Sequence, residues 1–399
     1  MVARLPRDPT RRGGPTCPCG YLLLTRDYIL PHGAARANAH EHWLRAPNKS
    51  EKAVPRHFDP ALINDPFDDP GLYVDLVFEK RALLFDLGDL GRLSPRKMLR
   101  ISDVFVTHLH MDHFAGFDQL LRRLLGREMT LGVYGPPGVI DAVEHKLKAY
   151  SWNLIGGYEG NLRFRVTEMD ESGRAASASF SGRTQFARRD EEKRQSSEGL
   201  LLKESGIQVR ATTLDHGLPV LAFALEERAH INIWRNKLGA LGLAVGPWLR
   251  KFKEATLRGA DDADLIKVAW ADAEDEKPDA LPFGMLKKEI MKISSGRKIA
   301  YVVDCAYTEC NIERIVKLAE GADTLFIEGG FLERDSAAAS KRRHLTARQA
   351  GTIARRAGVK RLVTFHYSPR CKGEGEELAR EAQDAFLRAG SEKVDRLFR

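Results

Sequence analysis

The sequence predicts an α/β fold in which two mixed β-sheets pack against each other and helices cover their outer faces. Each half of the chain begins with alternating apolar segments typical of hairpins and continues with strand–helix units. The 399 residues are 43% hydrophobic and 30% charged, which supplies enough apolar material for a sizeable core.

The N-terminal half contains the first series of strands and helices. Alternation between residues 72 and 85 predicts a hairpin that ends in the acidic turn Asp86–Asp89. An apolar strand at 103–107 leads into a helix at 114–125, whose apolar stripe we expect to pack in the core. Further elements are a strand at 131–134, a helix at 139–150 and strands between 160 and 186 interrupted at 171–175.

The C-terminal half repeats the change from hairpin strands to strand–helix units. After an exposed charged loop at 188–198, strands are predicted at 207–214 and 220–225. Residues 228–296 form an irregular segment rich in charge. Beyond it, strands and helices alternate at 298–303, 312–320, 324–327, 346–357, 361–365 and 374–389.

The amino-acid composition indicates how the chain is divided into domains and which cellular compartment it favours. Residues 1–55 are rich in Arg, Pro, Gly, Ala and His without a sustained period, so we expect a disordered extension. Residues 56–399 form the folded domain, with a basic insertion around 228–296. The net charge of +8 permits a polyanionic partner without requiring one. Five cysteines indicate no disulfide framework and favour the cytoplasm, and no apolar run approaches the roughly 18 residues of a membrane span.

Four metal-binding side chains lie close together after the first apolar strand. His108, His110, Asp112 and His113 fall within six residues. If the strand continues through Leu109, alternation points His108 and His110 to the same side. Imidazole and carboxylate are ligands that zinc prefers, and a polar loop with scattered histidines fits this density poorly. The sequence therefore predicts a divalent-metal site.

Polar side chains also stand where later apolar strands end. His216 lies between two strands, and Asp304, Glu328 and His366 each follow a buried-type strand. Taken singly, each has an ordinary explanation as a turn former or a hydrogen-bonded core residue. Because ligands on rigid strand ends converge with little ordering cost, their repetition favours one preorganised metal site.

The run His108-Leu-His110-Met-Asp112-His113 matches the HxHxDH signature of the metallo-β-lactamase superfamily, which this chain resembles. Within that superfamily the resemblance is to ribonuclease Z, the tRNA 3′-processing endonuclease. It is carried by Leu-Asp-His-Gly at 214–217, Arg-His-Leu-Thr-Ala-Arg-Gln-Ala at 343–350 and Phe-His-Tyr-Ser-Pro-Arg at 365–370. The resemblance covers about residues 66–399 and implies an αββα sandwich.

The resemblance implies a site with two zinc ions, or manganese as an alternative. One ion would be held by His108, His110 and His216, the other by Asp112, His113 and His366, with Asp304 bridging the two. Such a pair suits phosphodiester hydrolysis by a metal-activated hydroxide, which Asp112 would position or deprotonate.

Two further residues are implied to act in catalysis. His344 would protonate or stabilise the leaving 3′-oxygen, and Glu328 is retained from the family pattern. Thr346 and Gln349 have capping-box spacing, which places His344 just before a helix N-terminus suited to a phosphate. The alternative for His344 is a surface histidine in a basic turn.

The chain departs from the ribonuclease Z pattern at three places. Val303-Asp304-Cys305 replaces Gly-Asp-Thr, and Ile327-Glu328-Gly329-Gly330 replaces His-Glu-Ala-Thr. The N-terminal Gly-Thr-Gly opening is not recognisable. These departures concern the substrate more than the metal chemistry.

A basic stretch in the insertion is the candidate for RNA binding. Gly246–Lys253 resembles a Gly-Pro, Lys-rich loop of ribonuclease Z, in which Arg250, Lys251 and Lys253 would contact phosphates. Trp248 and Phe252 would stack on bases. The alternative is an amphipathic helix with solvated charges and inward aromatic residues.

These observations leave three functions open. The first is a zinc phosphodiesterase that acts on RNA, specifically precursor tRNA 3′ ends, as a cytoplasmic homodimer without membrane contact. The second is a hydrolase of the same fold that acts on a small phosphodiester, a cyclic nucleotide or an ester. The third is a non-catalytic RNA-binding protein. A redox di-iron protein is disfavoured because neither Leu109 nor Met111 is a glutamate.

Overall fold

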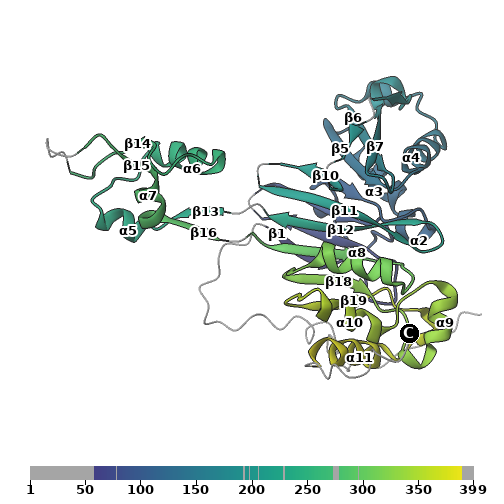
Figure 1. Ribbon diagram of the computed structural model, residues 1–399. Coiled ribbons are helices and arrows are strands. Elements are labelled where there is room, and N and C mark those ends of the chain that lie inside the picture. The colour runs from purple at the N-terminus through teal and green to yellow at the C-terminus, as the bar shows by residue number, and fades with distance from the viewer. Residues whose placement is uncertain are drawn as a thin grey trace, which may run out of the picture. The chain divides into compact units, whose positions relative to one another are not determined.

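The computed structural model describes residues 58–388, except 78, 192–193, 197, 205, 228–229, 273–277 and 295. The extension expected at 1–55 therefore lies outside the described residues. The described chain forms two large mixed β-sheets that pack face to face, with helices on the outer face of each (Figure 1). The predicted α/β class and the αββα sandwich are confirmed.

The first sheet has nine strands, and its centre is parallel. The order is β1 to β8 along the sheet, and β9 pairs with β7. Strands β3 to β6 run parallel, and the flanking pairs are antiparallel. The strands are β1 (Phe58–Leu62), β2 (Leu72–Leu76), β3 (Arg81–Phe85), β4 (Ile101–Phe105), β5 (Met129–Gly135), β6 (Leu162–Met169), β7 (Arg174–Ser181), β8 (Arg189–Asp190) and β9 (Arg194–Gln195).

The second sheet has six strands in the order β10-β11-β12-β17-β18-β19. The last three run parallel, so their carboxyl ends lie at one edge of the sheet. That edge carries the polar residues that the sequence places after apolar strands. The strands are β10 (Leu200–Lys203), β11 (Ile207–Asp215), β12 (Pro219–Glu227), β17 (Lys298–Val302), β18 (Thr324–Glu328) and β19 (Leu362–Phe365).

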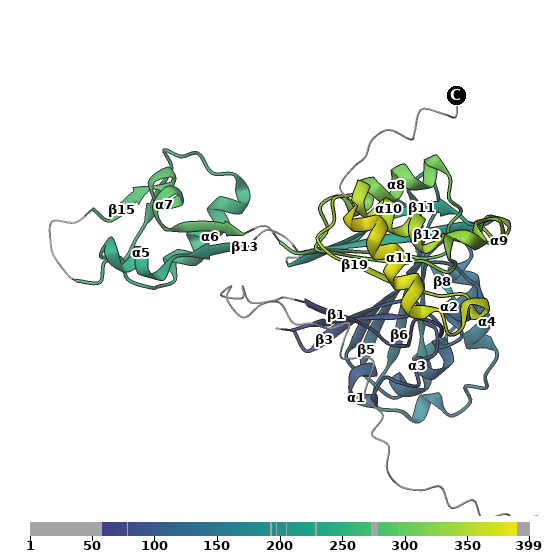
Figure 2. The ribbon, with the colours of Figure 1, turned by 90° about the horizontal axis from the view of Figure 1, so that it is seen from below.

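Three apolar layers hold the sandwich together. Between the sheets, aromatic rings of Phe85, Phe105, Phe223 and Tyr301 pack at centroid distances of 5.0–5.8 Å. The outer face of the first sheet is covered by α3 (Phe117–Leu124) and α4 (Val139–Lys148). The second sheet is covered by α8 (Glu309–Ala319) and α10 (Ala347–Arg356), beside α11 (Gly375–Leu387) (Figure 2). Short helices α1 (Pro95–Met98), α2 (Met111–Phe114) and α9 (Ser336–Arg342) join these elements.

The described residues between β12 and β17 form helices and strands of an insertion, so the prediction of an irregular segment is wrong. Its helices enclose a core of their own that includes Trp248, Phe252, Phe283 and Leu286. Its apolar residues were hard to recognise because they are separated by many charges. The elements are β13 (His230–Ile233), α5 (Arg235–Ala240), α6 (Trp248–Arg258), β14 (Leu265–Lys267), β15 (Ala280–Pro282), α7 (Phe283–Ile290) and β16 (Met291–Ser294).

The helix predicted at 114–125 is α3, and the separate short helix α2 precedes it and includes only Phe114 of the predicted range. The chain breaks at Gly116, where an added Cβ would lie 2.1 Å from the backbone oxygen of Gly88. A regular helix with larger residues could not approach that turn so closely. The apolar stripe of Phe117, Leu120 and Leu124 is nevertheless buried as predicted. Strands β1 and β10 and helices α1 and α9 were not predicted, and the loop at 188–198 contains the short strands β8 and β9.

Within the described residues, no helix is long and apolar enough to cross a membrane.

Candidate metal centre

The HxHxDH segment leaves the sheet earlier than expected. Strand β4 ends at Phe105, and His110 is the N-cap residue of α2. The prediction that strand alternation orients His108 and His110 is therefore wrong. The two rings still lie together, with centroids 4.4 Å apart, although residues 106–109 lie outside strands and helices.

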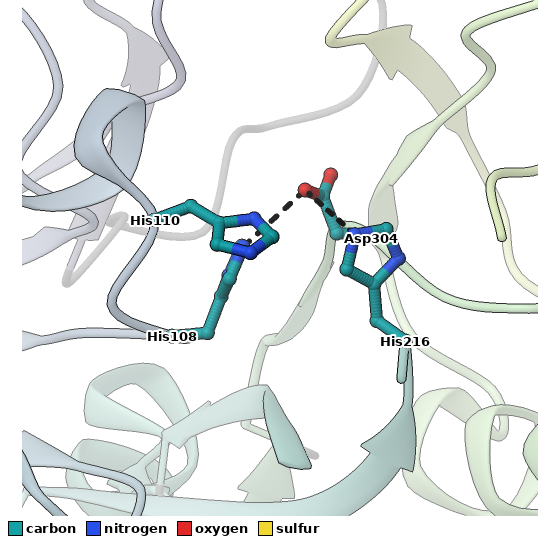
Figure 3. A group of neighbouring side chains, drawn as sticks. All are labelled: His108, His110, His216 and Asp304. Atoms are coloured by element: carbon teal, nitrogen blue, oxygen red, sulfur yellow. Dashed lines mark ion pairs between the residues drawn. The ribbon is translucent and has the colours of Figure 1, made fainter. Parts of the chain in front are cut away.

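Four predicted ligands form a first group around one point. His108, His110, His216 and Asp304 each offer a ligand atom, and these atoms all lie within 4.8 Å of one another (Figure 3). Asp304 Oδ2 lies 3.4 Å from His108 Nε2 and 3.8 Å from His216 Nε2. The residues come from three separate segments of the chain, so folding assembles the group.

A second group lies beside the first and shares its carboxylate. Asp112, His113 and His366 offer ligand atoms within 4.8 Å of one another. Asp112 Oδ2 lies 3.4 Å from His113 Nε2 and 3.3 Å from His366 Nε2. Asp304 reaches this group too, with Oδ2 3.4 Å from His113 Nε2 and Oδ1 2.9 Å from His366 Nδ1. The structure thus brings together all seven residues predicted as metal ligands.

The backbone at two of these positions is held in the left-handed region. Asp304 has φ of 38° and His366 has φ of 56°. Such conformations cost about 1–3 kcal/mol each for a residue with a side chain and concentrate at functional sites. The two side chains meet at the shared centre, where Asp304 Oδ1 lies 2.9 Å from His366 Nδ1.

The donor set fits a pair of divalent cations. His108 Nε2 and His113 Nε2 are buried and make no hydrogen bond among the described residues, although each lies 3.4 Å from Asp304 Oδ2. A buried polar atom without a hydrogen bond costs about 1–3 kcal/mol, so two such nitrogens in one place favour a further partner between them. Imidazole nitrogens and carboxylate oxygens at this spacing are suited to zinc or a similar ion.

The charges of the centre also favour bound cations. Burial raises the pKa of Asp304, but the imidazoles of His366 and His113 outweigh it and hold the pKa well below its usual range. Burial lowers the pKa of His366, but Asp304 and Asp112 outweigh it and raise the pKa to about 10. Burial dominates at His108 and lowers its pKa, so that ring is neutral, as a ligand must be. The carboxylates therefore attract positive charge to this point.

The buried carboxylate of Asp86 orients His113 and was missed in the sequence. Its Oδ2 lies 2.9 Å from His113 Nδ1, and its Oδ1 accepts a 2.8 Å hydrogen bond from the Thr107 amide. With Nδ1 held in this way, His113 directs Nε2 into the centre. The signal was available, because Asp86 follows an apolar strand just as Asp304 and His366 do.

His344 lies beside the two ligand groups and is held by Glu328. Glu328 is fully buried, accepts a 2.7 Å hydrogen bond from the Cys305 amide and lies 2.8 Å from His344 Nδ1. Burial lowers the pKa of His344, but the Glu328 carboxylate outweighs it and raises the pKa. The capping box of Thr346 and Gln349 predicted after His344 is confirmed. Because both Glu328 oxygens are engaged, Glu328 acts on the site through His344.

A cleft of about 580 Å³ opens beside the centre. Asp112 and His344 line this cleft together with aromatic, acidic and basic side chains. Its lining includes Phe67, Asp68, Asp69, Asp112, Phe331, Arg342, His344, His366, Tyr367 and Arg370.

The predicted RNA-binding residues belong to the insertion, on α6. Arg250, Lys251 and Lys253 are exposed, and Arg250 pairs with Glu254 at 3.0 Å. Trp248 and Phe252 are buried, at 7% and 0% exposure, so they pack inward and are not available to stack on bases. For these two aromatic residues, the structure agrees with the alternative prediction, an amphipathic helix whose aromatic side chains point inward. Trp234 is the more exposed aromatic residue here, with Lys237 Nζ 5.9 Å from its ring centre.

The fold and the site define a class of protein. Residues 74–231 and 276–367 match the family profile described as "Beta-lactamase superfamily domain". Two β-sheets flanked by helices, with a histidine–aspartate centre at the strand ends, are consistent with that class. The chain is a member of the metallo-β-lactamase superfamily.

Within the superfamily, the chain belongs to the ribonuclease Z family. It is 30% identical to the ribonuclease Z of Deinococcus radiodurans over 334 residues, which cover 82% of this chain and 95% of that relative. It is also 30% identical to the ribonuclease Z of Anoxybacillus flavithermus over 325 residues, covering 78% and 86%. A crystal structure of the short form of human tRNase Z aligns with a TM-score of 0.47 at 20% identity, covering 78% of this chain and 93% of that one. The predicted family is confirmed.

Proposed function

We propose that this protein is an endoribonuclease that hydrolyses a phosphodiester at the 3′ end of precursor tRNA. The observation that carries the proposal is the pair of ligand groups that share Asp304, directly beside His344 and an open cleft. Membership of a family whose relatives are named ribonuclease Z supports RNA as the substrate.

The two groups would hold two zinc ions, with manganese as the alternative. His108, His110 and His216 would bind one ion, and the second group would bind the other, with Asp304 between them. When bound, such a pair neutralises the charge of a phosphodiester and makes water a stronger nucleophile at neutral pH.

Asp112 is the residue assigned to the attacking water. Its side chain is 42% exposed and lines the cleft, while Oδ2 faces His113 and His366. Burial raises its pKa, but these two histidines outweigh it and lower the pKa far below the usual range. Asp112 therefore stays ionised, which suits a group that orients a water and accepts its hydrogen bond.

His344 is the residue assigned to the leaving oxygen. Its raised pKa keeps a proton on the ring to higher pH, and its side chain reaches the same cleft as Asp112. With Nδ1 held by Glu328, the remaining nitrogen is free to donate toward the leaving 3′-oxygen of the RNA. The products would be an RNA with a 3′-hydroxyl and a trailer with a 5′-phosphate.

The insertion would hold the RNA by its phosphates. Arg250, Lys251 and Lys253 follow one another on an exposed helix face and offer charge without reading base sequence. Recognition by shape suits a structured RNA such as tRNA. A homodimer in the cytoplasm completes the proposal; the scarcity of cysteine supports that compartment.

The deciding experiment incubates the purified full chain and zinc or manganese with a 3′-extended precursor tRNA, in parallel with bis(p-nitrophenyl) phosphate. We expect cleavage of the RNA at the end of the acceptor stem and loss of all cleavage in His110→Ala. Cleavage of the small ester alone would replace this proposal by a small-phosphodiester hydrolase. Binding of tRNA without cleavage of either substrate would favour the non-catalytic alternative.

A further inference from the structure

Tyr301 is a buried tyrosine at the contact between the two sheets. It lies on β17, three residues before Asp304, and is 1% exposed. Its ring packs between Phe85 and Phe365, at centroid distances of 5.8 Å and 5.3 Å. A phenylalanine would serve such packing equally well, so the hydroxyl group requires its own explanation.

The hydroxyl of Tyr301 donates to the carboxylate that orients His113. It lies 3.1 Å from Asp86 Oδ2, the oxygen that also lies 2.9 Å from His113 Nδ1. Thr107 donates to Asp86 Oδ1, so the side-chain hydrogen-bond partners of this fully buried carboxylate among the described residues are all donors. Burial and the nearby Asp86 both raise the pKa of Tyr301, so the phenol keeps its proton and remains a donor.

The donors around Asp86 come from different parts of the sandwich. Thr107 and His113 belong to the segment that follows β4 of the first sheet, whereas Tyr301 belongs to β17 of the second. Strand β17 also delivers Asp304, whose Oδ2 lies 3.4 Å from His113 Nε2. One hydrogen bond therefore connects the strand of the shared carboxylate to the group behind His113.

We infer that Tyr301 is a positioning residue for the second metal position: through Asp86 it fixes the direction of His113 Nε2 relative to Asp304. This inference rests on the metal centre of the proposed function but not on the identity of the substrate. Residues that hold a metal-binding histidine from behind change metal affinity by about 10–100-fold when they are removed. If Tyr301 served only as an apolar core residue, removal of its hydroxyl would leave metal affinity unchanged.

The test is a competition titration of the metal-free full chain with zinc against a chelator, in Tyr301→Phe and wild type. We expect two zinc equivalents in wild type and, because Tyr301 reaches His113 through Asp86, a loss at the lower end of this range, about tenfold, in affinity for one of them in the variant. In the cobalt-substituted protein, the visible absorption of the same equivalent should change. Asp86→Asn should produce at least the same loss for the same equivalent, and adding Tyr301→Phe to it should change the affinity little.

Tyr134→Phe is the matched control. Tyr134 packs against the same inter-sheet core, stacks on Phe105 at 4.9 Å, and also hydrogen-bonds an aspartate, Asp103, which is not in the metal centre. It should bind both zinc equivalents as wild type does.

Zinc affinity of Tyr301→Phe within twofold of wild type would overturn the inference. An equal loss of zinc affinity in Tyr134→Phe would also overturn it, because the effect would then come from core stability. A wild-type chain that binds no zinc would overturn it as well. If Tyr301→Phe does not fold, unchanged zinc affinity of Asp86→Asn overturns the inference in its place. A chain that binds zinc as expected but cleaves no RNA would refute the proposed function and leave this inference standing.

Discussion

The contact between Glu328 and His344 gives the sharpest prediction for catalysis. We would replace Glu328 with glutamine, which keeps the shape but carries no charge and offers one acceptor oxygen in place of the two that face the Cys305 amide and His344 Nδ1. The carboxylate is fully buried and lies 2.8 Å from the ring, so solvent screens their interaction little. Because the raised pKa of His344 depends on that charge, Glu328→Gln should lower the pKa and leave fewer rings protonated.

The size of the effect follows from the contact. A hydrogen bond to a charged group contributes about 1.5–3 kcal/mol, which corresponds to roughly 10–100-fold in rate if it acts fully in the transition state. Removal of the ring in His344→Ala should cost more, about 10²–10⁴-fold, the usual contribution of a general acid. Both losses apply to a substrate whose leaving alkoxide needs a proton.

The assay compares two leaving groups at saturating metal. Cleavage of precursor tRNA releases an alkoxide, whereas bis(p-nitrophenyl) phosphate releases a phenolate that leaves without protonation. We expect kcat on the RNA to fall in both variants and kcat on the small ester to change by less than about threefold, since no general acid is needed. In Glu328→Gln, the decline of RNA cleavage with rising pH should also begin at lower pH than in wild type.

Equal losses on the two substrates would refute the reasoning, because Glu328 would then support the metal centre as a whole. An unchanged pH profile for RNA cleavage in Glu328→Gln would refute it as well.

Three further predictions concern the metals, the charges and the RNA. Asp304→Asn should lower the affinity for both zinc equivalents by more than about tenfold, because the carboxylate contacts both ligand groups. A lower affinity for one equivalent alone would contradict a shared ligand. In the metal-free protein, the pKa of His366 is raised to about 10, so the stability that its protonation contributes is full below about pH 6.5 and is lost as pH rises toward 10. The unfolding midpoints of wild type and His366→Gln should therefore converge between pH 7 and 10. A difference that stays constant with pH would contradict this pH dependence. Replacing Arg250, Lys251 and Lys253 with alanine should raise KM for precursor tRNA, while hydrolysis of the small ester stays unchanged. The slope of log binding constant against log salt concentration should become shallower by up to about 2–3. An unchanged slope would show that α6 does not contact the RNA.

The sequence predicted which side chains come together at the strand ends, because the signals for these residues are local. His108 to His113 are close in the chain, and His216, Asp304 and His366 each mark the end of an apolar strand. Parallel pairing of β17, β18 and β19 then brings separate strand ends to one edge.

What the sequence did not predict depends on contacts between distant segments. Strand β4 ends early because the amide of Thr107 donates to Asp86, 21 residues away, instead of continuing the sheet. The spacing of Trp248 and Phe252 fits a base-stacking surface and a buried helix face equally well. Their packing in one cluster with Phe283 on α7 shows that they form a buried helix face. The role of Asp86 required the position of His113 to be known.

The place of the insertion in the second sheet has a consequence for how such a protein can vary. Strands β12 and β17 are hydrogen-bonded neighbours, paired at Glu226 and Lys298, and the Glu227 amide donates to the Arg297 carbonyl beyond them. The chain therefore leaves the sheet and returns to it at a single hairpin end. A segment grafted there can lengthen, shrink or be exchanged without shifting the register that places Asp304. The proposed RNA contact on the insertion and the ligand groups at the strand ends therefore lie in separate parts of the chain, which evolution or an engineer can alter one at a time.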